Sequence, residues 1–153
     1  MKKLAIMAVL ASAFTMASAA ELGVNVGRNF GSDQSYVGVS LGQKQGIYGV
    51  ALGFDHASSN VSPTVRSWNR LSLTGSRDLL KVGQHTVFGV KLGAAFVDPS
   101  KGKSGAAVVV GLGTTHPVTK HTSFVTDLSY QHGQNKIHQY DGGQFSLGFK
   151  HAF

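Results

Sequence analysis

The chain contains no cysteine among its 153 residues, so it has no disulfide framework, no thiolate nucleophile and no cysteine-ligated zinc site. Charged residues make up only 14% of the sequence, well below the quarter that is usual in soluble globular proteins. After the extreme N-terminus no apolar run reaches the roughly 20 residues that a membrane-spanning helix needs. An ordinary soluble helical enzyme and a helical membrane protein are therefore both disfavoured.

The first twenty residues have the pattern of an export signal. Lys2 and Lys3 precede an uncharged segment that extends to Ala20, and Ala17-Ser18-Ala19 supplies the small residues of a signal-peptidase site. The apolar centre is too short to span a bilayer as a helix. We expect a signal peptide over residues 1–20 and one mature domain over residues 21–153.

Apolar side chains recur at every second position throughout the mature domain, which is the periodicity of β-strands with two different faces. Eight such segments are visible, and the fourth, from Val65 to about Ser76, is the least regular. Their apolar faces are represented by Leu22, Val24 and Val26; Val37, Val39 and Leu41; Tyr48, Val50, Leu52 and Phe54; Leu71 and Leu73; Phe88, Val90, Leu92 and Phe96; Val108, Val110 and Leu112; Phe124, Leu128 and Tyr130; Phe145, Leu147 and Phe149.

The opposite faces are rich in glycine, a residue that weakens a strand and adds no solubilising charge. A narrow barrel interior has room only for small side chains, while lipid outside suits valine, leucine and phenylalanine. Spanning strands of about 10 residues and an even strand number fit eight strands into the mature chain. We therefore predict an all-β fold, an eight-stranded antiparallel up-and-down transmembrane β-barrel. The inner-face glycines are Gly23, Gly27, Gly38, Gly42, Gly49, Gly53, Gly89, Gly93, Gly111, Gly113 and Gly148.

A few charged residues share this glycine-rich face. Arg70, Lys91, Asp127 and Lys150 are expected to point into the lumen as a paired polar network. Lys91 and Asp127 are predicted to lie within pairing distance, and the filled lumen predicts that the barrel is not an open pore.

Connection lengths predict the orientation, because outer-membrane barrels have short periplasmic turns and longer external loops. The longer odd-numbered connections begin with 28–35 and include 56–64, 98–104 and 132–143, which we place outside the cell. The even-numbered connections are compact at 43–46 and 116–120, whereas 77–85 is longer than the rule predicts.

The C-terminal strand carries Phe145, Leu147, Phe149 and a final Phe153. It resembles the signal by which the barrel-assembly machinery recognises bacterial outer-membrane proteins. The whole mature chain is similar to the small eight-stranded outer-membrane barrels of the OmpX and OmpA class. This resemblance implies a location in the outer membrane of a Gram-negative bacterium.

A local resemblance to YfaZ-type outer-membrane proteins extends from Glu21 to Gly113. It rests on the Glu-Leu-Gly start of the first strand, on Gly-Val-Lys-Leu-Gly at residues 89–93, and on Asp98-Pro99 before a glycine-rich strand. This resemblance implies fold and location and no particular activity.

His56 and Ser58 are the candidate catalytic pair, because residues two apart on a strand share a face and can act as base and nucleophile. The arrangement resembles that of PagL-type lipid A deacylases. That family carries its His-x-Ser near the C-terminus, where this chain reads His132-Gly133-Gln134, and the mature chain has no glutamate except Glu21. We therefore expect no catalytic site. The alternatives to a structural or surface-interaction role are a PagL-like hydrolase, a small narrow pore and a soluble periplasmic lipocalin-like binder.

The remaining motifs predict partners rather than chemistry. His132, His138 and Asp141 share a loop, and His116 and His121 flank a turn, but neither spacing fixes three metal ligands, so no metal or cofactor is expected. We expect a monomer whose partners are outer-membrane lipids, lipopolysaccharide and the assembly machinery, with no nucleic acid. The external basic residues that would meet lipopolysaccharide phosphates are Arg28, Lys101, Lys103 and Lys136.

Overall fold

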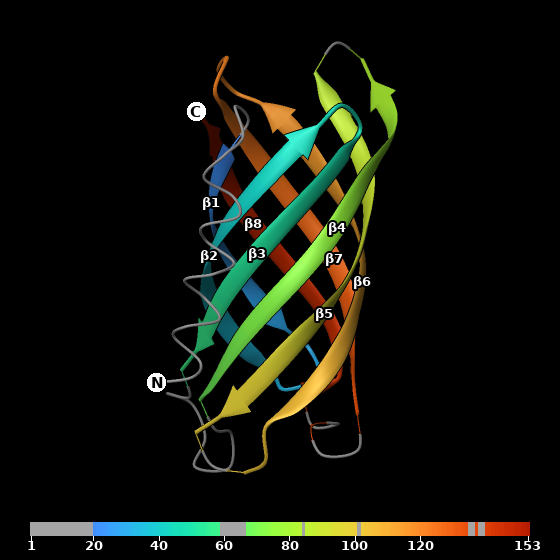
Figure 1. The fold of residues 1–153 in the computed structure, drawn as a ribbon. Helices are drawn as coiled ribbons and strands as arrows, with labels where there is room; N and C mark the ends of the chain where they lie inside the picture. Colours follow the sequence, from blue (N-terminus) through green and yellow to red (C-terminus); the bar gives the residue numbers. More distant parts are fainter. Residues whose placement is uncertain (1–19, 59–66, 84, 101, 135–136, 138–139) are drawn as a thin grey trace.

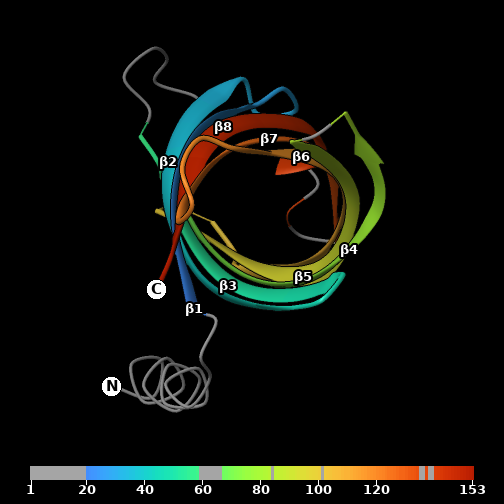
Figure 2. The ribbon, with the colours of Figure 1, turned by 90° about the horizontal axis from the view of Figure 1, so that it is seen from above.

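The computed structural model describes residues 20–58, 67–83, 85–100, 102–134, 137 and 140–153. They form one closed barrel in which every strand pairs antiparallel with its neighbours in the sequence, and β1 pairs with β8 to close the ring (Figures 1 and 2). The strands are β1 (Ala20–Asn29), β2 (Gln34–Gln45), β3 (Tyr48–Ala57), β4 (Trp68–Val82), β5 (Thr86–Pro99), β6 (Gly105–Pro117), β7 (Thr122–Gly133) and β8 (Gly142–Ala152).

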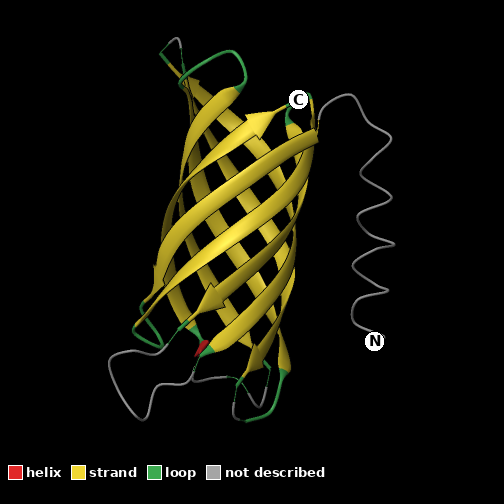
Figure 3. Cartoon of the chain, turned by 90° about the vertical axis from the view of Figure 1, so that its left-hand side faces the viewer, coloured by secondary structure: helices red, strands yellow, loops and turns green. Residues whose placement is uncertain are grey.

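Closure follows from the face pattern of the strands. In lipid, an open sheet edge would leave backbone N–H and C=O groups without partners, and a closed barrel removes that edge. The strands run obliquely around the axis, as closure of a narrow barrel requires (Figure 3). The eight-stranded up-and-down topology predicted from the sequence is confirmed.

The outer face is apolar, as the two-residue periodicity predicted. Val26, Leu92 and Leu112 expose 58%, 62% and 60% of their surface on three different strands. Exposure of this kind along every strand is stable only in contact with hydrocarbon. Among the described residues, no helix is long and apolar enough to cross a membrane.

The fourth strand differs from its prediction. It was expected from Val65 to about Ser76, but it runs from Trp68 to Val82. Residues 65 and 66 lie outside the described residues. At its other end, the strand keeps pairing with β5 as far as Val82, across a β-bulge between Asp78 and Leu80 that shifts the register. At the bulge, the consecutive residues Leu79 and Leu80 are both 60% exposed. This break in the two-residue alternation is why the sequence pattern did not predict the end of the strand.

This extension also corrects the long connection expected at 77–85. The turn between β4 and β5 spans only residues 83–85, with Gly83 at a φ of 64°. The other even-numbered turns are also short, at 46–47 and 118–121. The first connection, expected at 28–35, is shorter than predicted, at 30–33.

The three even-numbered turns, the start of β1 and the C-terminus lie at one end of the barrel (Figure 1). We call this the periplasmic end and the opposite end the external end, following the rule that periplasmic turns are short. The predicted signal peptide lies outside the described residues except for Ala20, where β1 begins.

Candidate functional site: a plug in the external half of the lumen

Arg70 on β4 is the centre of a polar cluster inside the barrel. Its Nε donates to Asp55 Oδ2 on β3 at 2.9 Å, and its Nη1 donates to Gln131 Oε1 on β7 at 3.1 Å and also to Gln144 Oε1 on β8. The Arg70 and Asp55 side chains are only 9% and 7% exposed. Because a guanidinium presents its donors in a rigid planar fork, one side chain ties four strands together across the lumen.

The two glutamines extend this cluster to the connection between β7 and β8. Gln144 Nε2 donates to Gln131 Oε1 at 3.3 Å, and Gln131 Nε2 donates to the Tyr140 carbonyl at 3.2 Å. From β1, Asn29 Nδ2 donates to the same carbonyl at 3.2 Å. Tyr140 is therefore held inside the barrel mouth by the walls.

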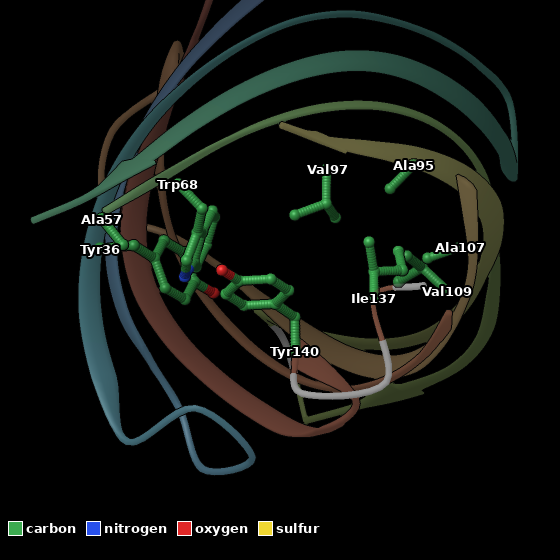
Figure 4. Packing of buried hydrophobic residues seen from close by; sticks show 9 residues of the cluster. All are labelled: Tyr36, Ala57, Trp68, Ala95, Val97, Ala107, Val109, Ile137 and Tyr140. Carbon is green, nitrogen blue, oxygen red and sulfur yellow. The ribbon is translucent and has the colours of Figure 1, made fainter. Parts of the chain in front are cut away.

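Aromatic and aliphatic side chains complete the closure (Figure 4). The Tyr36 and Trp68 rings lie 5.8 Å apart, and Tyr140 meets Trp68 edge-on at 6.5 Å. The Arg70 guanidinium lies 5.2 Å from the centre of the Tyr36 ring, a cation–π distance. We call these buried residues together with the Arg70 cluster the plug; its apolar members are Tyr36, Ala57, Trp68, Ala95, Val97, Ala107, Val109, Ile137 and Tyr140.

The periplasmic half of the lumen contains a cavity of about 240 Å³. Glycine, serine and threonine line much of its wall, and it ends against Tyr36, Asp55 and Arg70. The filled lumen expected from the sequence is therefore found only in the external half. Small side chains explain the difference, because Gly49, Gly53 and Ser72 leave space that larger residues occupy nearer the external end.

Besides the Arg70–Asp55 pair at its external end, three ion pairs line the cavity. Lys91 Nζ lies 2.6 Å from Asp127 Oδ1, Lys44 Nζ lies 2.7 Å from Asp78 Oδ2, and Lys150 Nζ lies 3.7 Å from Glu21 Oε2. These side chains are 17–38% exposed, so water reaches them. Pairing of opposite charges keeps the cavity wall close to neutral.

The structure does not join the four predicted lumen residues into one network. Arg70 belongs to the plug, Lys91 and Asp127 pair with each other, and Lys150 pairs with Glu21. Sequence reasoning missed the partners Asp55, Gln144 and Glu21. Their positions carried a signal, because each lies an even number of residues from an inner-face glycine on its own strand: Gly53, Gly148 and Gly23.

The candidate catalytic pair lies on the outer wall near the external end. His56 and Ser58 are both exposed, and His56 Nδ1 lies 2.8 Å from Asn69 Oδ1. His132 Nδ1 lies 3.1 Å from Asp141 Oδ2, whereas His138 falls outside the described residues. Within the described part of the chain, no group of three or more His, Asp or Glu side chains is arranged to hold a metal ion.

The external basic residues are placed only in part. Arg28 Nη2 pairs with Asp33 Oδ1 at 2.5 Å, and Lys103 is exposed. Lys101 and Lys136 lie outside the described residues. The residues of the predicted C-terminal assembly signal are exposed on β8 and directly after it. The exposed fractions of Phe145, Leu147, Phe149 and Phe153 are 41%, 37%, 50% and 72%.

Comparison with known proteins identifies the fold. No protein-family model and no curated protein matches the sequence. The N-terminal β-barrel domain of Pseudomonas aeruginosa OprF is similar in structure, with a TM-score of 0.71 and 17% sequence identity over 89% of this chain and 98% of that one. This chain has the fold of a bacterial outer-membrane β-barrel.

Two further solved structures agree with this assignment. Neisserial surface protein A (NspA) matches with a TM-score of 0.60 and 13% identity over 88% of this chain and 95% of that one. Ail, the attachment invasion locus protein of Yersinia pestis, matches with a TM-score of 0.55 and 12% identity over 88% and 97%. The outer-membrane class predicted from the sequence agrees with this fold, whereas the YfaZ-type resemblance stays a prediction.

Proposed function

We propose that this protein is a non-conducting barrel of the bacterial outer membrane, with a structural or surface-interaction role at the cell surface. The observation that carries the proposal is the plug. A buried arginine is hydrogen-bonded to three other strands and lies beside Tyr36 and Trp68, and this arrangement across the external half of the lumen supports a closed barrel. A barrel closed in this way supports contacts made by its external connections rather than transport through its lumen.

Planar lipid bilayers test the closed lumen directly. The purified barrel is expected to give no discrete conductance steps, whereas the double variant Tyr36→Ala/Trp68→Ala, with two large plug side chains removed, is expected to give them. Discrete steps from the wild-type protein would replace this proposal with the small-pore alternative. Gel mobility with and without heating confirms that each preparation is folded.

The proposed partners follow from the two ends of the molecule. The exposed aromatic positions of β8 support recognition by the assembly machinery, and exposed Lys103 with its basic neighbours supports contact with lipopolysaccharide phosphates. Deleting Phe153 is expected to lower the amount of folded barrel in outer-membrane fractions. Unchanged amounts would remove the assembly signal from the proposal.

The hydrolase alternative has a clear test of its own. The imidazole of His56 is hydrogen-bonded to the neutral amide of Asn69 rather than to a carboxylate that would stabilise its protonated form. Mass spectrometry of lipid A from cells expressing the protein is expected to show all acyl chains intact. Loss of an acyl chain that depends on Ser58 would establish the hydrolase instead.

A further inference from the structure

The outer wall of β3, β4 and β5 carries a row of polar side chains close to its external end. His56, Asn69 and Asp98 are direct register partners across the three strands. His56 and Asn69 are exposed and joined by their 2.8 Å hydrogen bond, while Asp98 accepts a hydrogen bond from Ser104 Oγ. Three adjacent polar side chains thus lie together on the outer wall at this end of the three strands.

A matching apolar row lies two residues nearer the middle of each of these strands. Phe54, Leu71 and Phe96 are also register partners, and two-residue spacing places them on the same face as the polar row. Phe54 and Phe96 are 40% and 42% exposed. Within one patch of wall, the surface therefore changes from hydrocarbon-compatible to hydrogen-bonding over two residues.

The plug stiffens this patch from behind. Residues next to the two rows point into the lumen. Val97 lies between the rows and Ala57 and Trp68 lie just beyond the polar row, and all three are at most 2% exposed. Asp55 and Arg70 on β3 and β4 are fixed by their ion pair. Rotation or bending of this wall would disturb the plug, so the two rows are held in place before any ligand arrives.

We infer that this two-row surface binds one outer-leaflet glycolipid, with sugar hydroxyl and amide groups on His56, Asn69 and Asp98 and acyl chain on Phe54, Leu71 and Phe96. The polar row offers both donors and acceptors, which suits hydroxyl and amide groups, and the Asp98 carboxylate disfavours a bare phosphate at its end of the row. The site rests on the proposed outer-membrane location and is independent of whether the lumen conducts.

Native mass spectrometry of the folded full-length barrel in detergent tests the site, with purified lipid A and phosphatidylglycerol added separately. The wild-type barrel is expected to retain lipid A about tenfold better than the double variant His56→Leu/Asn69→Leu, which loses its polar row. Phosphatidylglycerol is expected to bind both proteins equally. Equal retention of lipid A by the wild type and the double variant would overturn the site. If the double variant lost phosphatidylglycerol binding to the same extent as lipid A binding, the glycolipid assignment would be overturned.

Two further variants separate the site from general effects on the barrel. His116 also faces outward and bonds a neighbouring threonine, with Nδ1 3.0 Å from Thr86 Oγ1, but it lies near the periplasmic end. His116→Leu is expected to retain lipid A like the wild type, and His56→Gln, which keeps a partner for Asn69, is expected to retain most of the binding. If His116→Leu lost as much lipid A binding as the double variant, the site would be overturned. Conductance by the wild type in planar bilayers would overturn only the closed lumen.

Discussion

Arg70 donates three hydrogen bonds to side chains on other strands. Asp55, Gln131 and Gln144 each present an oxygen to it, and none of these residues is near it in sequence. The interior at this level is shielded from water, so each partner depends on the others for its hydrogen bonds. The stability of the external half therefore depends strongly on one side chain.

Replacement of Arg70 by alanine is expected to lower the free energy of unfolding by about 3–5 kcal/mol, because the Asp55 carboxylate stays buried without its counter-charge. Urea titration of the barrel refolded into lipid vesicles measures this loss. Lys103→Ala, at an exposed external position, serves as the control and is expected to change little. A loss below 1 kcal/mol for Arg70→Ala would show that the ion pair is not needed for stability.

The inward direction of Arg70 could be predicted from the alternation of faces, since Leu71 and Leu73 define the outer face of the same strand. Its partners could not be selected in the same way. Side chains on β3, β4, β7 and β8 meet only because the barrel closes. The periodicity within one strand does not show which residues of different strands lie at the same level along the barrel axis. The pair Lys91 and Asp127 was expected from opposite charges on the inner face, and the structure places Lys91 Nζ 2.6 Å from Asp127 Oδ1.

At the scale of the strand, glycine sets how closely the lumen walls and side chains approach. A Cβ atom added at Gly111 on β6 would lie 2.8 Å from Ser129 Cβ and 2.9 Å from Lys91 Cε. The same atom added at the outward-facing Gly75 on β4 would meet only the Leu92 carbonyl oxygen, at 3.8 Å. The two positions thus differ in packing.

Gly111→Ala is accordingly expected to destabilise the barrel by about 1–3 kcal/mol through overpacking against Ser129 and Lys91. Gly75→Ala is expected to be neutral or to stabilise by up to about 1 kcal/mol, because alanine restricts the unfolded chain more than glycine does. Urea titrations of both variants in the same vesicles compare them. Equal effects at the two positions would contradict the crowded-lumen explanation for the inner glycines.

The outer face makes a second prediction at this scale. Leu92→Arg, at a 62% exposed position in the middle of β5, is expected to cost about 2–4 kcal/mol in a bilayer. His116→Arg, near the periplasmic end, is expected to cost about 0–1 kcal/mol, because the penalty falls toward the interface. A similar cost at both positions in vesicle unfolding experiments would mean that the apolar band does not contact hydrocarbon.

The number of strands, their topology and the direction of their side chains could be predicted. Lipid outside and crowding inside impose the same alternation of apolar and small residues on every strand. The ends of β4 could not be predicted, because the bulge inserts Leu79 out of phase and makes the following residues look like a loop. A local irregularity of this kind depends on the neighbouring strand and is invisible to a periodicity that assumes regular pairing.

At the scale of the whole molecule, the lumen is asymmetric along its axis. The external half is occupied by the plug, while the periplasmic half holds the 240 Å³ cavity and its ion pairs. Sequence reasoning treated the lumen as uniform, since it counted small and charged residues on the inner face without assigning them to heights. The division between the halves lies at Tyr36, Asp55 and Arg70.

The reactivity of single introduced cysteines can measure this asymmetry, because the natural chain contains no cysteine that would also react. Ser76→Cys, at an exposed position on the cavity wall, is expected to react rapidly with a water-soluble maleimide added to the folded barrel. Ala107→Cys, where alanine is 3% exposed within the plug, is expected to react only after unfolding. Rapid labelling at both positions would show that water crosses the plug.

The closed lumen that we propose also determines where an electric field acts. Water in the periplasmic half has a high dielectric constant and supports little potential difference along its length. In the proposed closed barrel, a voltage across the outer membrane therefore falls mainly over the short external segment that the plug occupies. The oppositely charged side chains of Arg70 and Asp55 lie where that gradient is steepest.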